Sequence, residues 1–221
     1  MKTQDLPETA LFHGLSQEEV HWALSALDAH RYAFTKDQLL AQAGQCVSHL
    51  GLVLSGCVHI EHLDVWGSKT LLGQATEGDL FAETYACLPQ EPLLVNVTAA
   101  TDGEVLFLSA APLLEPGNAP CLQHIAQNLL QISARKNLGL ARRNLYTAPK
   151  TIRERVMTYF SALAIKNGSL DFILPFDRQQ LADFLGVDRS ALSSTLSRMQ
   201  RDGLLTLNRR TVELHTTPEG L

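Results

Sequence analysis

The sequence lacks any hydrophobic run of the ~18 residues that a membrane-spanning helix needs. Its first ten residues, MKTQDLPETA, also lack the apolar core of a signal peptide. We therefore expect a cytoplasmic protein with no membrane partner. The 221 residues are 45% hydrophobic and 19% charged, which is typical of a folded protein and is long enough for two domains, each with its own core.

Cysteine is scarce, and its spacing excludes the common metal and disulfide patterns. The four cysteines, Cys46, Cys57, Cys87 and Cys121, form no CxxC pair, and none precedes Cys46. Such isolated cysteines indicate reduced thiols in a core more than a zinc or iron–sulfur site. We predict no metal site from them.

An overall positive charge, which would suggest nucleic-acid binding, is also absent. The net charge is -5, but its distribution is uneven. Residues 1–146 hold 8 Lys and Arg against 15 Asp and Glu, whereas residues 147–221 hold 10 against 8. The C-terminal part is therefore the part whose charge suits a DNA partner.

The most informative stretch is residues 176–205, FDRQQLADFLGVDRSALSSTLSRMQRDGLL. Leu181, Phe184 and Leu185 form one apolar helix face, and Asp177 with Gln180 fits a capping box. Gly186 permits a tight turn before a second helix.

The second helix, which opens at residue 188 or 189, has an apolar side and a polar side. Leu192, Leu196 and Met199 lie at i, i+4 and i+7 and predict the buried side. The opposite side has small hydroxyls and guanidinium groups, which suit phosphates and guanine edges. Its residues are Arg189, Ser190, Ser193, Ser194, Ser197, Arg198 and Arg201.

A short hairpin follows Gly203, with its turn at residues 208–210 and an alternating return strand. Together with the two helices, this hairpin predicts a winged helix-turn-helix. The alternative, a helical hairpin packed into a core, would not need an arginine- and hydroxyl-rich face beside a basic wing.

Residues 31–108 show a period of two, interrupted by turn residues every eight to twelve positions. This pattern predicts an antiparallel β-barrel or jelly roll, a fold that can enclose a small ligand. The candidate strands are residues 31–34, 39–41, 49–54, 57–63, 69–75, 79–82, 93–100 and 104–109.

Residues 115–146 predict a long helix that ends at Ala148-Pro149. Its 3-4-3-4 spacing of apolar residues favours a homodimer seam over packing on the chain's own barrel. The predicted seam residues are Leu122, Ile125, Leu129, Ile132 and Lys136.

Barrel, long helix and winged helix-turn-helix, in this order, resemble the cyclic-AMP receptor protein/FNR (Crp/Fnr) family of bacterial transcription regulators. The resemblance covers nearly the whole chain, and its most specific segments are residues 181–190 and 78–83. It implies an α+β fold with three parts. Residues 1–114 would form a cyclic-nucleotide-binding-like sensor domain, residues 115–147 a dimerisation helix and hinge, and residues 148–221 the DNA-binding domain.

In that family the second helix of the motif enters the major groove, and each half of a dimer binds half of a palindrome. The resemblance implies that Arg189 reads a guanine through O6 and N7. The glutamate that follows in the cyclic-AMP branch is Ser190 here, and the second base-reading arginine is Ser194, so the operator should differ from the consensus of that branch. The implied DNA-binding residues are Gln179, Asp188, Arg189, Ser190, Ser193, Ser194 and Arg198.

The resemblance also implies an effector pocket formed by Gly78, Asp79, Leu80, Phe81, Ala82, Glu83, Leu93 and Leu94. In nucleotide-binding members a glycine–glutamate pair holds the ribose, and an arginine–serine pair ten residues on binds the cyclic phosphate. Glu83 matches that glutamate, but the glycine is Ala82 and the arginine–serine pair is Leu93-Leu94. Because leucines cannot compensate a phosphate charge, the sequence argues against cyclic AMP.

Other effectors stay open. The sequence lacks the N-terminal cysteine cluster of FNR, and haem is a hypothesis that an absorbance spectrum without a Soret band would exclude. A regulator without a ligand, whose activity is set by its abundance or by oxidation of Cys87, is also compatible with the sequence. The candidate axial haem ligands are His13, His21, His30, His49, His59, His62 and His124.

A cupin-like metalloenzyme is the alternative from another class. It would need His49, His59, His62 and Glu83 to meet, and their spacing matches no known ligand motif. We therefore predict a homodimeric regulator that binds double-stranded DNA and contacts RNA polymerase, and no enzyme. An unidentified effector would change the packing of the two long helices and re-aim the recognition helices at a hinge near residues 147–149.

Overall fold

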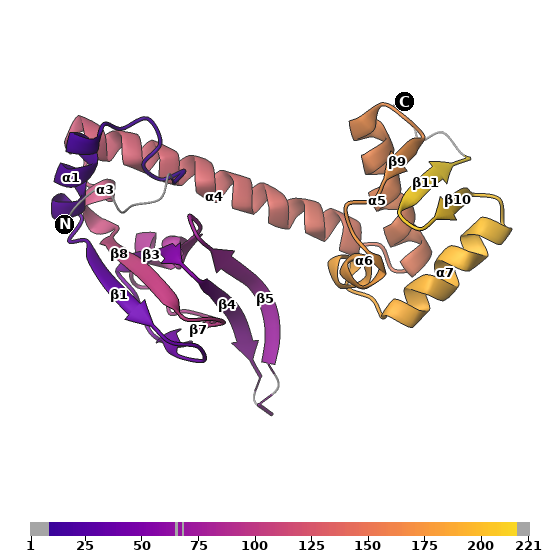
Figure 1. The fold of residues 1–221 in the computed structure, drawn as a ribbon, viewed down its shortest axis with the longest axis horizontal. Helices are drawn as coiled ribbons and strands as arrows, with labels where there is room; N and C mark the ends of the chain where they lie inside the picture. Colours follow the sequence, from indigo (N-terminus) through magenta and orange to yellow (C-terminus); the bar gives the residue numbers. More distant parts are fainter. Residues whose placement is uncertain (1–8, 65, 68, 216–221) are drawn as a thin grey trace. The chain divides into compact units, whose positions relative to one another are not determined.

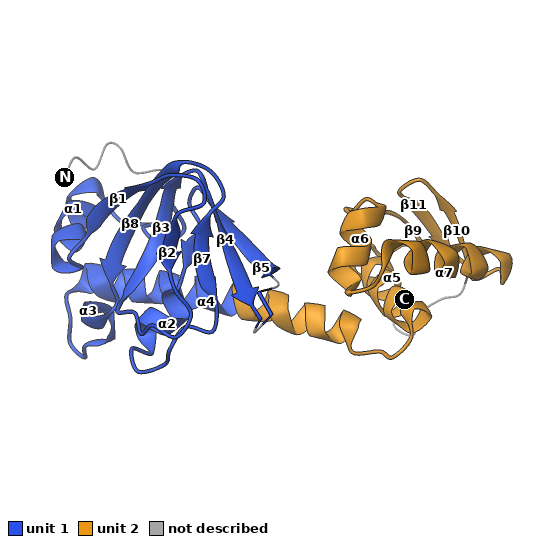
Figure 2. Ribbon diagram, turned by 90° about the horizontal axis from the view of Figure 1, so that it is seen from below, with its two compact units in different colours: residues 1–135 blue, residues 136–221 orange. Residues whose placement is uncertain are grey.

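The computed structural model describes residues 9–64, 66, 67 and 69–215 of the protein, which folds into two compact units. Unit 1 is Met1–Arg135 and unit 2 is Lys136–Leu221 (Figure 1); Figure 2 shows the units in separate colours. The division lies inside the long helix α4, Pro120–Thr147, and thus differs from the predicted hinge near residues 147–149. Both tryptophans, Trp22 and Trp66, lie in unit 1.

Two antiparallel four-stranded sheets form the body of unit 1, in the orders β1-β8-β3-β6 and β2-β7-β4-β5. Their apolar faces meet, which confirms the predicted jelly-roll architecture, although the two sheets do not close into one barrel. The strands are β1 (His30–Phe34), β2 (Leu39–Ala41), β3 (His49–Ser55), β4 (Cys57–Leu63), β5 (Lys69–Thr76), β6 (Leu80–Phe81), β7 (Asn96–Ala99) and β8 (Gly103–Ser109).

Side chains alternate between the two faces of the strands, so unit 1 has two hydrophobic cores. The helix-side core lies between the first sheet and the helices, and the inter-sheet core lies between the two sheets. On β3, Leu50, Leu52 and Leu54 face the helices and belong to the helix-side core, whereas Val53 belongs to the inter-sheet core. Gly51 lies on the inter-sheet side and leaves room for the ring of Phe81, whose Cζ lies 2.2 Å from the place a Cβ would occupy. The space between the sheets is therefore largely filled by side chains.

Helices cover the outer face of the first sheet. They are α1 (Gln17–Ala26), α2 (Glu83–Cys87), α3 (Ala111–Leu114) and the start of α4. Ser16 caps α1 in a reciprocal box with Glu19. Leu11 and Phe12 are buried in the helix-side core, so the segment before α1 packs there. Helices α2 and α3 are too short for their periodicity to be predicted.

The first turns of α4 correct part of the predicted dimer seam. Leu122, Ile125 and Leu129 are at most 5% exposed and belong to the helix-side core of their own unit. These three side chains therefore pack on their own sheet, which is the alternative that the spacing also allowed. Ile132 is partly buried against the same core, and Lys136 is exposed.

Unit 2 packs three helices on a three-stranded antiparallel sheet of order β10-β11-β9. Its core joins all of these elements. Strand β9, Asp171–Ile173, was not among the predicted strands. The elements are α5 (Ile152–Asn167), β9 (Asp171–Ile173), α6 (Arg178–Leu185), α7 (Arg189–Arg201), β10 (Leu205–Asn208) and β11 (Thr211–Leu214).

Local signals fix the helix ends in unit 2. Thr151 with Glu154 and Asp177 with Gln180 form capping boxes at the starts of α5 and α6. Gly186 has a φ of 63°, the left-handed conformation that lets α6 end and the chain turn into α7. Among the described residues, no helix combines the length and the apolar character that crossing a membrane requires.

Candidate DNA-binding surface and effector pocket

The recognition helix α7 is anchored by its apolar side. Leu192, Leu196 and Met199 are at most 1% exposed and belong to the core of unit 2. This anchoring leaves the opposite side at the surface, where Arg189, Ser194 and Arg198 are exposed. The amphipathic pattern of α7 therefore yields the polar surface that its sequence predicts.

Asp188 caps α7 and organises its first turn. Its carboxylate accepts hydrogen bonds from the backbone N–H groups of Ser190 (2.8 Å) and Ala191 (2.9 Å) and from the Ser190 hydroxyl. The Ser190 hydroxyl, followed by the Ala191 N–H, holds the pKa of Asp188 below its ordinary value. An acidic side chain so engaged positions its neighbours, and the Ser190 hydroxyl still has free acceptor capacity.

The other predicted contacts lie at three places on unit 2. Ser193 is partly buried, and its carbonyl accepts the Ser197 hydroxyl at 3.0 Å. Arg198 lines a hollow of about 330 Å³ together with the start of α5. Gln179, exposed near the start of α6, donates to the Asp183 carboxylate at 2.9 Å.

The wing presents two arginines with different surroundings. Arg210 donates to the carbonyls of Leu174 (2.9 Å) and Pro175 (2.8 Å), which fastens the wing to the segment after β9. Arg209 is exposed, has a φ of 55° and makes no hydrogen bond or ion pair with the described residues. Arg209 is therefore the wing cation that is free for another partner.

A single arginine that the sequence does not single out holds the turn of the motif. Arg155 of α5 donates to the carbonyls of Pro149 (2.8 Å), Leu185 (3.0 Å) and Gly186 (3.2 Å). It thereby ties the segment after α4 to the turn between α6 and α7. A residue whose partners lie about thirty positions away in the chain leaves no local signal.

An aromatic cluster joins the end of α4 to α6. Tyr159 lies 5.2 Å from Tyr146 and 5.0 Å from Phe184, measured between ring centroids. Burial raises the pKa of Tyr159 to about 12, so its phenol stays neutral. Arg143 also reaches from α4 to the Asp183 carbonyl at 3.5 Å. The last turns of α4 are therefore packed on the helix-turn-helix, at the place where a hinge was predicted.

The structure separates the predicted effector residues. Gly78 and Asp79 form the turn between β5 and β6, where the Asp79 carboxylate accepts from Thr76. Leu80 belongs to the helix-side core and Leu94 is 71% exposed, so the prediction is wrong in placing these two in an interior pocket. Leu93 is buried in the inter-sheet core.

Ala82 and Glu83 stand where the resemblance implies a glycine and a glutamate. Ala82 has a φ of 58°, a conformation that glycine adopts at no steric cost and alanine does not. Glu83 begins α2 and is 6% exposed. The backbone shape that favours glycine is therefore present, although the glycine is not.

A hollow of about 300 Å³ opens at the mouth between the two sheets, and Phe81 and Ala82 line it. The rings of His30 and His49 also line it, with centroids 5.4 Å apart. Within the part of the chain that the structure describes, no lysine or arginine lines this hollow. It therefore offers apolar and imidazole surface but no fixed positive charge for a cyclic phosphate.

The structure gives little support to a cupin-like metal site or to regulation by oxidation of Cys87. Within the described residues no three His, Cys, Asp or Glu side chains are grouped as a metal site requires, so His49, His59, His62 and Glu83 do not form a cupin-like centre. Burial, and then the charge of Glu83, raises the pKa of the Cys87 thiol. A raised pKa lowers the thiolate fraction on which oxidation depends.

Comparison with known proteins follows the same two-part division. A cyclic nucleotide-binding domain model matches residues 31–115, and a Crp-like helix-turn-helix domain model matches residues 154–219. The chain belongs to the Crp/Fnr family of transcriptional regulators. It is thus a DNA-binding transcriptional regulator, from a family of regulators and not of enzymes.

Two curated relatives from the Crp/Fnr family align along most of the chain. The transcriptional activator protein FnrL of Cereibacter sphaeroides is 24% identical over 196 residues, which cover 83% of this chain and 76% of FnrL. The cyclic AMP receptor protein of Thermus thermophilus is 27% identical over 204 residues, which cover 92% and 91% of the two chains.

Solved structures share the Crp/Fnr architecture. The catabolite activator protein of Thermus thermophilus superposes with a TM-score of 0.50 at 25% identity, covering 94% of each chain. The c-di-GMP-responsive global regulator CLP of Xanthomonas campestris superposes with a TM-score of 0.55 at 20% identity, covering 91% of this chain and all of CLP. The CLP match shows a shared fold.

Proposed function

We propose that this Crp/Fnr protein acts as a homodimer on a palindromic operator, with an effector other than cyclic AMP bound to unit 1. The observation that carries the DNA part is α7, a helix with a buried leucine side and an exposed arginine–serine side. Each protomer would place α7 in a major groove. Regulation would take place in the cytoplasm and include contact with RNA polymerase.

The reading of DNA is assigned to two kinds of contact. Arg189, exposed at the start of α7, would read a guanine, while Ser190, Ser193 and Ser194 would make short-range contacts nearby. Gln179, Arg198 and Arg209 would meet phosphates, which position the protein without reading sequence. Asp188 would act indirectly, by capping the helix that carries these groups.

The dimer is assigned to the apolar side of α4 that unit 1 leaves uncovered. Leu130, Leu138 and Leu145 are each more than half exposed. They lie with Ala134 and Ala141 at spacings of three and four residues, hence on one side of the helix, away from Leu122, Ile125 and Leu129. Two such stripes from two protomers would bury each other.

Two observations support an effector in unit 1 that is not cyclic AMP. Neither Leu93, in the inter-sheet core, nor the exposed Leu94 can compensate a cyclic phosphate. Unit 1 is nevertheless the part that matches a cyclic nucleotide-binding domain, and therefore the part with a sensor fold. An effector would act by favouring one packing of the paired α4 helices over another.

The DNA assignment is tested with purified protein and DNA from upstream of its own gene, by fluorescence anisotropy across salt concentrations. Arg189→Ala should weaken binding by about 10- to 100-fold because a bidentate guanine contact is worth about 1–3 kcal/mol. Lys166→Ala, which removes an exposed charge of α5 outside the recognition helix, is the matched control. Equal affinities of Arg189→Ala and wild type would refute the assignment.

The dimer assignment is tested by sedimentation equilibrium. Leu138→Glu should give monomers, because it puts a charge into the stripe. Leu140→Glu makes the same change two residues on, at an exposed position on another side of α4, and should leave the dimer intact. Dissociation of both variants, or of neither, would contradict this seam.

A further inference from the structure

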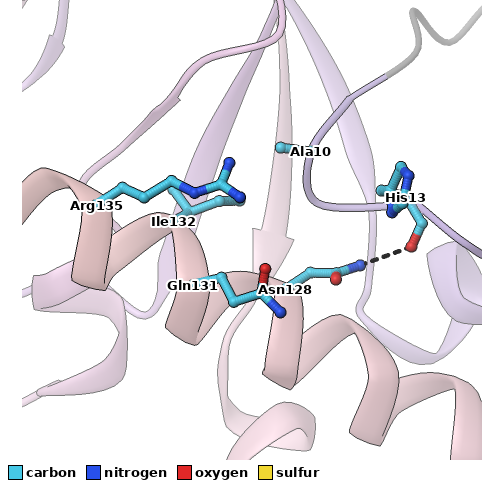
Figure 3. Close-up of a pocket in the computed structure, with 6 residues that line it drawn as sticks. All are labelled: Ala10, His13, Asn128, Gln131, Ile132 and Arg135. Atoms are coloured by element: carbon cyan, nitrogen blue, oxygen red, sulfur yellow. Dashed lines mark hydrogen bonds between the residues drawn. The ribbon is translucent and has the colours of Figure 1, made fainter. Parts of the chain in front are cut away.

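A second hollow in unit 1 lies between α4 and the segment that precedes α1. It measures about 290 Å³ and is lined by Ala10, His13, Asn128, Gln131, Ile132 and Arg135. Figure 3 shows the long side chain of Arg135 reaching from α4 toward the segment that carries Ala10 and His13. Four of the six lining residues are polar, in contrast to the apolar inter-sheet core.

Asn128 fixes the shape of this hollow. The side chain is only 8% exposed, and its amide nitrogen donates to the carbonyls of Leu11 at 3.0 Å and His13 at 2.9 Å (Figure 3). Leu11 is itself buried in the helix-side core. The two walls of the hollow are therefore joined before any ligand arrives, which lowers the ordering cost of binding.

Among the described residues that line the hollow, Arg135 carries a fixed charge, and this charge is positive. Arg135 makes no hydrogen bond or ion pair with the described residues, and neither does the side chain of Gln131. No aspartate or glutamate among the described residues lines the hollow. A guanidinium with five free N–H donors pairs best with a carboxylate or a phosphate, which accepts two of them at once.

From this arrangement we propose that the hollow binds a small organic anion through a carboxylate or phosphate group. Arg135 holds the oxyanion, Gln131 donates a further N–H, and Ile132 and Ala10 contact the apolar part. A volume near the lower end of the usual range for ligand pockets limits the ligand to a small metabolite. This site is separate from the residues that resemble a cyclic-nucleotide pocket.

The position of the hollow suggests what the anion does. Gln131 and Arg135 each directly follow a member of the uncovered stripe, Leu130 and Ala134 respectively. A bound anion therefore ties α4 to the segment before α1 next to the proposed dimer seam and favours one packing of the paired helices. This regulatory role rests on the proposed function, whereas the binding itself does not.

The binding is tested by calorimetry on the full-length protein without DNA. Succinate and inorganic phosphate serve as separate probes, each compared with chloride at the same ionic strength. Wild type should bind at least one probe, and Arg135→Ala should bind it about 10- to 100-fold more weakly, because a charge-assisted hydrogen bond is lost. Arg142→Ala removes an exposed charge from the same helix outside the hollow and should bind like wild type.

Each outcome decides the proposal. Binding of succinate alone assigns a carboxylate ligand, and binding of phosphate alone assigns a phosphate ligand. Failure of both probes to bind above chloride overturns the site, and so does an equal loss in Arg135→Ala and Arg142→Ala. An Arg189→Ala protein should still bind the probe, so a failed DNA assignment remains distinguishable from a failed anion site.

The regulatory role is tested with the probe that binds. It should change the operator affinity of wild type and leave that of Arg135→Ala unchanged. An unchanged affinity of wild type would overturn the regulatory role.

Discussion

The two segments that most resemble the Crp/Fnr family, one in each unit, differ in whether their side chains are exposed or buried. In unit 2, the segment around α7 keeps its polar side chains at the surface, above leucines that are fully buried. In unit 1, the segment from Gly78 to Leu94 contributes Phe81 and Leu93 to the inter-sheet core. One segment therefore presents its functional groups, whereas the other has become part of the packing.

The difference shows which function is tied to local sequence. A recognition helix needs only an amphipathic pattern and a cap, and both lie within about fifteen residues. A ligand pocket needs empty space, and that space depends on side chains from several strands. A cyclic-nucleotide-binding fold can therefore have leucines at the positions where the family resemblance implies phosphate-binding groups.

The largest expected effect separates Leu93 from Leu94, the two leucines at the positions where the resemblance implies an arginine–serine pair. Leu93→Ala should lower the free energy of unfolding of unit 1 by about 2–5 kcal/mol, because it leaves a cavity in a core. Leu94→Ala should change it by less than about 0.5 kcal/mol, because Leu94 is exposed.

Tryptophan fluorescence during urea unfolding measures this pair, since both tryptophans report on unit 1 alone. Similar costs for the two variants would mean that the inter-sheet core does not include Leu93.

A smaller effect concerns Ala82, whose positive φ is a backbone conformation that favours glycine. Ala82→Gly should stabilise unit 1 by about 1 kcal/mol, because it relieves the positive φ. Ala86→Gly, in a helical position of α2, should instead destabilise it. The same fluorescence measurement applies, and destabilisation by both changes would contradict the strain at Ala82.

The smallest effect concerns the cap of the recognition helix. Asp188 should titrate with a pKa below its ordinary value. Ser190→Ala should raise this pKa, because the Ser190 hydroxyl is the largest cause of the shift. Because the folded pKa is the lower one, the carboxylate stabilises the fold above its ordinary pKa. This contribution is lost as the pH falls through the folded pKa. Carboxyl-carbon NMR titration measures both values, and identical ones would contradict the capping geometry.

Much of the fold follows from local sequence. Glycine turns and alternation predict the sheet strands of unit 1 to within a few residues, and Asp177 and Gly186 act where their chemistry predicts. These signals are short-range, and so are the structures they specify. The polar side of α7 follows for the same reason.

The sequence could not tell which partner buries an apolar stripe. Leu122, Ile125 and Leu129 have the spacing of a dimer seam, but a sheet distant in the chain covers them. The Arg135 hollow is equally invisible, because it arises from Asn128 holding residues more than a hundred positions earlier. Long-range contacts decided both cases.

The arginine at position 155 has a consequence for how operator preference can change during evolution. One guanidinium and a set of buried leucines hold the turn and the helix, and neither belongs to the exposed side of α7. If Ser194 contacts bases as proposed, substitutions there would change the DNA sequence that is read while leaving the scaffold intact. Position 155 itself would not tolerate lysine, whose single nitrogen lacks the planar fork that meets carbonyls from two separate segments. We therefore expect homologues with different operators to vary on the exposed side of α7 and to retain arginine at position 155.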